Sequence, residues 1–200
     1  MIKIDPKPMS DEERVRYEKQ VLLPGKRWLA THPNTTQKPR DYWREIQLDL
    51  ARTFHLRCAY TATFLNYNGQ VDHFVSINED REKAYDWDNF RYCVGWVNAK
   101  KQNLPSAKLL DPLLVEDDWF ELSVPDLQLR VTEHCPAELR DKAEFMLEKL
   151  GLRNHQREIE NRATYWNLYQ EKRAEVLPFL EREAPLVARA ARKHLAENAP

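Results

Sequence analysis

The spacing of apolar residues near the N-terminus predicts helices separated by an extended segment. Residues 10–23 begin with Ser10 and carry Glu13 at the third following position, which is the pattern of a helix capping box. Residues 24–40 are punctuated by proline and are expected to form an extended strap. Residues 40–56 predict a second helix, because apolar residues recur there at helical spacing. These residues are Trp43, Ile46, Leu50 and Phe54.

The middle of the chain has the composition of β-strands. Residues 57–65 and 70–77 are rich in β-branched and aromatic side chains. Asn68 and Gly69 lie between them, and this pair favours a hairpin turn because both residues tolerate a positive φ. We expect residues 81–102 to begin as a loop and to end as a helix. The predicted order is therefore strand, turn, strand, loop and helix.

The second half predicts one more hairpin and then helices. Residues 118–124 and 127–133 read as two strands joined around a Pro-Asp turn. From residue 136 onward the pattern is helical, with breaks or bends at Pro178 and Pro185. We therefore expect an α+β fold with a mostly helical C-terminal region.

Composition and charge exclude several classes of protein. Charged residues make up 32% of the 200 residues and hydrophobic residues 42%, with 4 glycines, which is typical of a globular, helix-rich chain. A formal net charge of −1 gives no overall field that would attract nucleic acid, so any such binding has to come from local patches. We expect no membrane span and no signal peptide, and hence a cytoplasmic protein. Cys58, Cys93 and Cys135 form an odd set, so we expect reduced thiols.

A set of polar residues in the middle of the chain has a spacing that carries chemistry. Asp72 and His73 are adjacent, Asn89 follows His73 by 16 positions, and Asn98 precedes Lys101 in an Asn-x-x-Lys sequence. Each residue alone is an ordinary turn or cap residue. Together they resemble the signature of the HNH (ββα-metal) endonucleases, and the resemblance covers about residues 56–103.

The resemblance implies a metal-dependent hydrolysis of phosphodiester bonds. Asp72 and Asn98 would hold Mg²⁺ or Mn²⁺, since carboxylate and amide oxygens suit such cations and leave positions open for a phosphate. His73 would be the general base that takes a proton from the attacking water. Asn89 would bridge loop and strand so that the His73 ring faces this water. Lys101 would neutralise a substrate phosphate.

One departure from the family concerns zinc. Many HNH proteins carry two C-x-x-C pairs that bind a structural zinc ion, whereas the corresponding segments here are Cys58-Ala59-Tyr60-Thr61 and Val94-Gly95-Trp96-Val97. Three of the four thiolates are missing, and a structural zinc site needs four ligands. We therefore expect no structural zinc, with apolar packing by Val94, Trp96 and Val97 in its place.

Further segments are similar to the PtuB-like branch of the HNH family, the nuclease partners of PtuA-like ATPases in Septu and retron anti-phage systems. These segments are RCAYTA, AYDWDNFRYC and FMLEKLGLRNHQREIENRATYW. The resemblance implies a defence nuclease, acting on DNA with an ATPase partner. The predicted elements and the extent of the motif together give three parts: an N-terminal helix and strap in residues 1–40, an HNH nuclease core with a flanking hairpin in residues 41–135, and a helical region in residues 136–200.

Two alternatives stay open. An HNH effector could cleave RNA, such as tRNA, because a one-metal site needs no particular sugar. The chain could instead be a degenerate HNH fold that serves as a scaffold or binding subunit. The presence of the metal and base positions favours an active enzyme.

Overall fold

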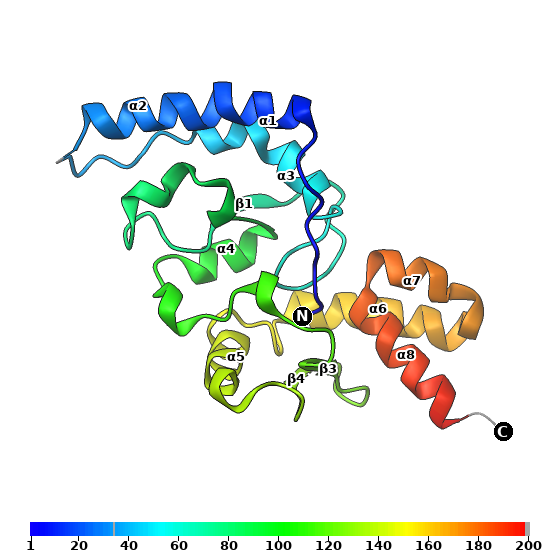
Figure 1. Ribbon diagram of the computed structural model, residues 1–200. Coiled ribbons are helices and arrows are strands. Elements are labelled where there is room, and N and C mark those ends of the chain that lie inside the picture. The colour runs from blue at the N-terminus through cyan, green and yellow to red at the C-terminus, as the bar shows by residue number, and fades with distance from the viewer. Residues whose placement is uncertain (34, 199–200) are drawn as a thin grey trace. The chain divides into compact units, whose positions relative to one another are not determined.

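Helices and two small antiparallel hairpins make up the computed structural model, which describes residues 1–33 and 35–198 (Figure 1). The chain forms two units. Unit 1 consists of residues 1–4, 59–64 and the chain from Lys108 onward, and unit 2 of residues 5–58 and 65–107. In this described part, no helix combines the length and apolar character that crossing a membrane requires. The helices and the two hairpins together confirm the predicted mixture of helices and small sheets.

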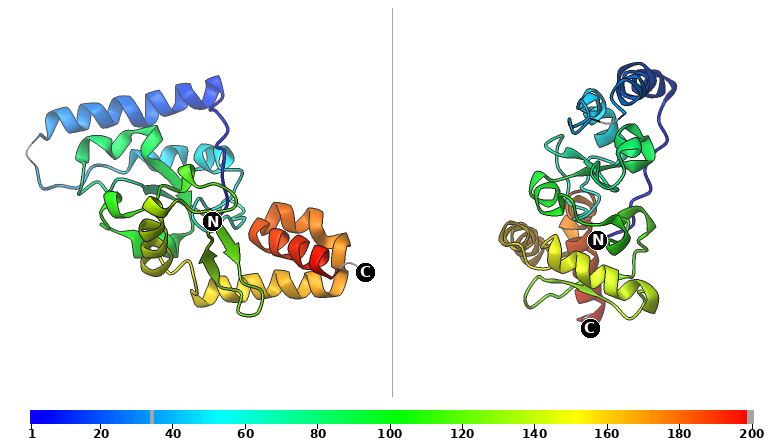
Figure 2. Two further views of the ribbon diagram at one scale, coloured as in Figure 1. Left: turned by 60° about the horizontal axis from the view of Figure 1, so that its bottom comes forward. Right: turned by 90° about the vertical axis from the view of Figure 1, so that its left-hand side faces the viewer.

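The N-terminal helices of unit 2 form one continuous rod. Helix α1 (Asp11–Tyr17), the π-helical turn η1 (Glu18–Leu22) and α2 (Leu23–Thr31) follow one another without a break, and Figure 2 shows them in one line. The predicted capping box is confirmed. The Glu13 amide donates to Ser10 Oγ at 3.3 Å, and the Ser10 amide donates to Glu13 Oε2 at 2.8 Å.

The extended strap expected for residues 24–40 is wrong for its first part, because residues 24–31 are helical. Pro24 would ordinarily break a helix, since its ring clashes with the carbonyl four residues earlier. Here the preceding turn is a wider π-turn, in which the Leu23 amide donates to the carbonyl of Glu18. Such a turn makes room for the proline ring, so the rod continues.

The central hairpin of unit 2 joins strands β1 (Gln70–His73) and β2 (Phe90–Cys93). They pair antiparallel, with Asp72 opposite Arg91 and His73 opposite Phe90. The connecting loop contains two 3₁₀ turns, η3 (Arg81–Tyr85) and η4 (Trp87–Asn89). Helix α4 (Gly95–Lys101) follows β2 after one residue. The helix expected at the end of residues 81–102 is confirmed, and it follows a strand that the sequence pattern missed.

The hairpin expected between residues 57–65 and 70–77 is wrong, because β1 pairs with β2 instead. Residues 59–64 belong to unit 1, where Tyr60 is fully buried, and are not available to β1. The Leu65 amide donates to the carbonyl of Leu56 at 2.8 Å, where the chain re-enters unit 2. Positive φ angles occur at Asn66 and Tyr67 rather than at the expected Asn-Gly turn.

Gly69 is needed for a close approach rather than for a turn. A Cβ atom at this position would lie 2.3 Å from the Tyr92 ring, well inside van der Waals contact. The Gly69 amide instead donates to the Tyr92 hydroxyl at 2.8 Å. The entry to β1 is therefore fixed against β2 by a glycine and a buried tyrosine.

The helix predicted for residues 40–56 is confirmed in two parts, the 3₁₀ turn η2 (Tyr42–Ile46) and α3 (Gln47–Thr53). The buried face consists of Trp43, Ile46 and Leu50. This face explains the apolar spacing in the sequence, because residues three and four apart share one side of a helix.

Unit 1 contains the second hairpin and the C-terminal helices. Strands β3 (Phe120–Leu122) and β4 (Leu129–Val131) pair antiparallel, which confirms the predicted hairpin. Two short 3₁₀ turns, η5 (Ser106–Lys108) and η6 (Pro112–Leu114), precede it. The predicted helical region is also confirmed. Its elements are α5 (Ala137–Lys149), α6 (Gln156–Lys172), η7 (Arg173–Val176), α7 (Leu177–Glu183) and α8 (Pro185–Glu197).

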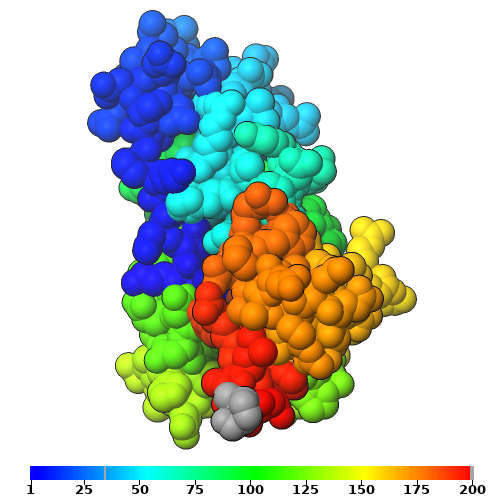
Figure 3. Space-filling model, turned by 90° about the vertical axis from the view of Figure 1, so that its right-hand side faces the viewer, coloured from blue at the N-terminus to red at the C-terminus, as the bar shows by residue number. Residues whose placement is uncertain are grey.

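The last three helices of unit 1 share one apolar core. Figure 3 shows α6, α7 and α8 side by side on one face of the unit. The core between them includes Tyr169, Leu180 and Val187, each at most 1% exposed. Pro185 lies at the first position of α8, where its missing amide costs no helical hydrogen bond.

Candidate active site

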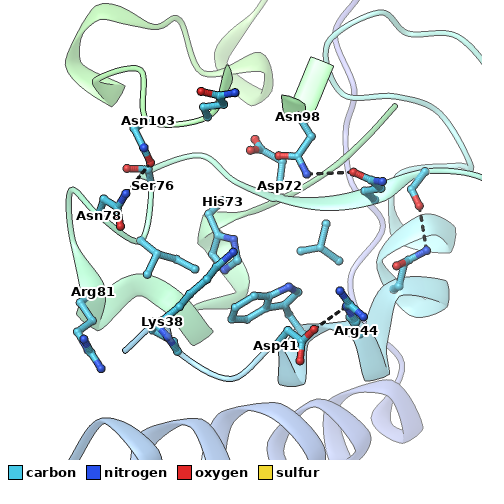
Figure 4. A pocket seen from close by; sticks show the side chains of 18 of the residues that line it. Lys38, Asp41, Arg44, Asp72, His73, Ser76, Asn78, Arg81, Asn98 and Asn103 are labelled. Atoms are coloured by element: carbon cyan, nitrogen blue, oxygen red, sulfur yellow. Dashed lines mark hydrogen bonds and ion pairs between the residues drawn. The ribbon is translucent and has the colours of Figure 1, made fainter. Parts of the chain in front are cut away.

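A polar pocket lies in unit 2 and brings most of the predicted site residues together. Its volume is about 1180 Å³, and its lining comes from residues 35–47, the segment around β1, the following loop and α4. Asp72, His73 and Asn98 line it, and Figure 4 shows them on the same side of the cavity. Asn89 and Lys101 lie behind this lining. Three separate segments of sequence therefore meet at one cavity.

Asp72 and Lys101 form a buried ion pair behind the pocket. Lys101 Nζ lies 3.1 Å from Asp72 Oδ1, and the two side chains are 0% and 4% exposed. Lys101 Nζ also donates to the carbonyl of His73 at 2.5 Å. One ammonium thus ties the end of α4 to two successive residues of β1. Removing one partner of a buried ion pair is costly, because the remaining charge loses its counter-ion.

The sequence predicts that Lys101 contacts a substrate phosphate, but the Lys101 side chain is buried and does not line the pocket. A fully buried ammonium that holds Asp72 and the His73 carbonyl can reach a substrate only by leaving both partners. Sequence gave no sign of this, because lysine is rarely buried unless it is paired. The geometry assigns Lys101 to positioning β1 against α4.

His73 is half-buried and its ring is held on two sides. Its Nε2 lies 2.9 Å from the carbonyl of Ala84. A carbonyl can only accept, so Nε2 carries the proton and Nδ1 of the neutral ring keeps its lone pair. The Trp43 ring packs edge-on at 4.5 Å between centroids and the Phe90 ring at 5.2 Å. The imidazole is therefore fixed in one tautomer and one orientation.

The pKa of His73 lies below its ordinary value of 6.5. Burial is the largest cause, because it disfavours the charged imidazolium, and the positive charges of Lys101 and Lys38 act in the same direction. The hydrogen bond to Ala84 and the charge of Asp72 oppose this shift. A lowered pKa keeps the ring neutral at physiological pH, which is the state that a proton acceptor needs.

Asn89 is buried and uses its side-chain amide to hold the loop between the strands. Its Oδ1 accepts from the Val75 amide at 2.8 Å, and its Nδ2 donates to the carbonyls of Val75 at 3.0 Å and Lys83 at 3.1 Å. Lys83 directly precedes Ala84, whose carbonyl orients His73. Asn89 thus connects the segment that follows β1 to the residue that precedes Ala84.

Asn98 lies on α4 one turn before Lys101, so both side chains point from the helix toward β1. Its Nδ2 donates to Oε1 of Gln70 at 3.2 Å, which leaves Oδ1 without a hydrogen bond among the described residues. Gln70 and Asp72 project to the same face of β1. Asn98 Oδ1 and the Asp72 carboxylate therefore both border the pocket (Figure 4).

These two oxygen donors fit a hard divalent cation that keeps water and substrate oxygens as its other ligands. The Lys101 ammonium already contacts Asp72 Oδ1 and would share that carboxylate with such a cation. Among residues 1–33 and 35–198, no group of three or more His, Cys, Asp or Glu side chains could hold a metal ion by itself. A metal here would thus depend on Asp72, on the amide of Asn98 and on the substrate.

Cys58, Cys93 and Cys135 are buried thiols that form no disulfide. The Val94 amide lies 3.5 Å from Cys58 Sγ, which brings the two segments aligned with the zinc-binding pairs together. Burial raises the pKa of Cys93 well above its ordinary value, so the thiol stays protonated. Val97 is fully buried in the same region, while Val94 and Trp96 are partly exposed.

Trp43 and Lys38 are two of the pocket residues that the sequence pattern did not indicate. The helical spacing of Trp43 predicts a packing residue, and Trp43 is indeed buried, but it also lines the pocket and its ring contacts His73. Lys38 belongs to the segment expected as a strap and lines the same pocket. The only signal for Lys38 was a locally basic stretch, which is more often a solvated surface.

Comparisons with known proteins leave the family open. A scan against protein-family models finds no match, and a search of curated proteins finds no matching protein. Membership in the HNH family therefore stays a prediction from the residues named above.

Proposed function

We propose that unit 2 is a metal-dependent nuclease of the HNH type, which hydrolyses phosphodiester bonds. The observation that carries this proposal is the fixed, neutral imidazole of His73 in a pocket that also presents the oxygens of Asp72 and Asn98. The order of strand, loop, antiparallel strand and helix corresponds to the ββα arrangement that the family resemblance implies. DNA is the favoured substrate, and RNA is the alternative.

His73 has the features of a general base. With Nε2 donating to Ala84, a proton from the attacking water would pass to Nδ1. The resulting imidazolium would be stabilised by the carbonyl of Ala84 and by the negative charge of Asp72. Trp43 and Phe90 pack against the ring and keep it from turning away, so the imidazole is already oriented before the reaction.

Asp72 and Asn98 would hold Mg²⁺ or Mn²⁺ through one carboxylate and one amide oxygen. When bound, such a cation would polarise the phosphate and stabilise the leaving oxygen. Lys101 and Asn89 would act as positioning residues, the first by fixing β1 to α4 and the second by fixing the loop that orients His73. An ATPase partner and a role in anti-phage defence stay predictions of the sequence resemblance.

The test is cleavage by purified protein of plasmid DNA, single-stranded DNA and tRNA, each with Mg²⁺, Mn²⁺ or EDTA. We expect cleavage with a divalent cation, none with EDTA, and a loss of at least about 100-fold in His73→Gln, as for removal of a general base. A wild type that cuts none of these substrates would contradict the proposal and favour a binding subunit.

His55→Gln is a matched control within the same unit. Its Nε2 also bonds a backbone carbonyl, that of Asp5 at 3.0 Å, but its side chain does not line the pocket. We expect this variant to cut like the wild type. Equal losses in both variants would mean that removing any such histidine damages the fold, and His73 would lose its role as base.

A further inference from the structure

Because Lys101 is buried, another basic side chain has to bind the negatively charged phosphate of a substrate. Three basic side chains line the pocket, namely Lys38, Arg44 and Arg81. A cation that is already neutralised or enclosed contributes less to a phosphate, because it has to give up existing interactions first. The three differ clearly in this respect.

Arg44 and Arg81 are engaged within the protein. Arg44 Nε lies 2.7 Å from Asp41 Oδ2, so its charge is paired at the edge of the pocket. Arg81 donates from Nη1 to the carbonyl of Thr35 at 2.8 Å, and its guanidinium lies 4.7 Å from the centroid of the Trp28 ring. Its Nε and Nη2 have no hydrogen-bond partner among the described residues, but both are buried, so a phosphate can reach them only if the side chain moves. In Figure 4 the Arg81 side chain runs away from His73.

Lys38 differs in having no ion pair or hydrogen bond from its ammonium to any described residue. It is exposed, and it precedes Pro39, which is buried. A proline disfavours the helical conformation of the residue before it, which favours an extended backbone at Lys38. Figure 4 shows its side chain running from this segment toward His73. An unpaired ammonium thus extends beside the imidazole that we assign as base.

We propose that Lys38 contacts the backbone phosphate of a nucleic-acid strand in this pocket, and that this contact recognises the strand through charge alone. The inference rests on the nuclease function proposed above and names the group that receives the substrate. A lysine ammonium is a compact point charge without the planar fork of arginine. It reads neither sugar nor base, so the contact contributes equally to DNA and RNA strands.

Binding can be measured apart from cleavage, by fluorescence anisotropy of labelled oligothymidine and oligouridine of equal length in EDTA. Lys38→Gln is expected to weaken the binding of both oligonucleotides about tenfold at low salt. The slope of log K against log salt should fall by about 0.7, the value for one phosphate contact on a single strand. Lys38→Arg should keep most of the affinity, because it keeps the charge.

Lys100→Gln is the control, since Lys100 is exposed on α4 of the same unit and does not line the pocket. Equal effects of Lys38→Gln and Lys100→Gln would overturn the inference, as would a loss for one oligonucleotide only. A wild type that binds neither strand would also overturn it. Because Lys38 is exposed, melting temperatures of both variants should match the wild type.

The two proposals fail in different ways. If the wild type cuts nucleic acid and Lys38→Gln binds and cuts normally, the nuclease stands and the role of Lys38 is wrong. If the wild type binds in a Lys38-dependent manner but never cuts, the role of Lys38 stands and the nuclease is wrong. Binding and cleavage assays on the same two proteins separate these results.

Discussion

Both units bury charged side chains, but they use them differently. In unit 1, Arg162 is 4% exposed and donates to the carbonyls of Leu127, Leu152 and Arg153, next to the buried Glu158. In unit 2, the buried Lys101 holds Asp72, whose carboxylate borders the pocket. Arg162 binds backbone carbonyls of two loops, whereas Lys101 binds a carboxylate at the border of the pocket.

The comparison teaches that burial of a charge does not by itself mark a functional site. Burial raises the pKa of Glu158 and lowers the pKa of His73, so both units contain a perturbed titratable group. Perturbed pKa values accompany structural networks as well as active sites. What separates His73 is that it lines a cavity beside oxygen donors and an unpaired cation.

The largest expected effect comes from removing each buried cation in turn. Lys101→Met and Arg162→Met each remove a buried cation from the groups that it holds, so the free energy of unfolding should fall by about 3–5 kcal/mol in both, as measured by urea titration. The cleavage rate per folded molecule should also fall ~100-fold, but only in Lys101→Met, because β1 is no longer fixed in position against α4. Equal cleavage rates per folded molecule in the two variants would contradict the claim that only Lys101 supports the pocket.

Asn89→Ala should give the next largest effect. Three hydrogen bonds between its side chain and the backbone are lost, and the free energy of unfolding should fall by about 2–3 kcal/mol. Cleavage should fall about 10- to 100-fold, since the loop no longer orients His73. Asn161→Ala in α6 of unit 1 loses no hydrogen bond from its side chain and should change neither quantity. An unchanged rate in Asn89→Ala would show that the loop needs no such support.

The pH dependence of cleavage sharpens the contrast further. Since the pKa of His73 lies below 6.5, kcat/KM should rise with pH, with its inflection below 6.5, and then level off. Lys38→Gln removes a positive charge that disfavours the imidazolium and should move the inflection upward. An inflection above 6.5 in the wild type would argue against His73 as the base.

The same shift has a consequence for stability. The unfolded chain binds a proton at His73 more readily than the folded chain does, because the pKa is lower in the folded state. The contribution of this residue is therefore fully present above pH 6.5 and is lost as the pH falls toward the folded-state pKa. Urea titrations of the wild type and His73→Gln across this range should differ in slope with pH.

The smallest effect is expected at the capping box. Ser10→Ala removes the hydrogen bond to the Glu13 amide on an exposed helix end and should cost about 1 kcal/mol. Cleavage should be unchanged, because neither residue lines the pocket. A fall in specific activity would mean that the N-terminal rod influences the site.

The elements that the sequence predicted correctly are those specified by neighbouring residues. The capping box of Ser10 and Glu13 and the hairpin around Pro125 and Asp126 depend on residues within a few positions of each other. The helices after residue 136 follow from apolar spacing along one segment. Two strand predictions failed for a different reason. Most of residues 57–65 belong to the other unit and do not pair with β1. Strand β2 has only four residues, and its partner residues in β1 lie 17 or more positions earlier in the chain.

The candidate site was predictable in its residues but not in their environments. The order of Asp72, His73 and Asn98 indicated that they would meet, and they line one pocket. The burial of Lys101 and the exposure of Lys38 depend on how distant segments pack, and sequence spacing contains no such information. For this reason sequence spacing alone could not show which lysine is exposed at the pocket.

The interleaving of the two units has a consequence for synthesis. Unit 2 is complete in sequence at Ala107, so its pocket can form while most of unit 1 is still to be translated. Residues 59–64, however, leave the ribosome early and find their own unit only after the segment from Lys108 onward has followed. Residues 1–4 precede them and belong to the same unit, so both segments, including the buried side chains of Met1, Ile4 and Tyr60, have to wait for a core that is translated later.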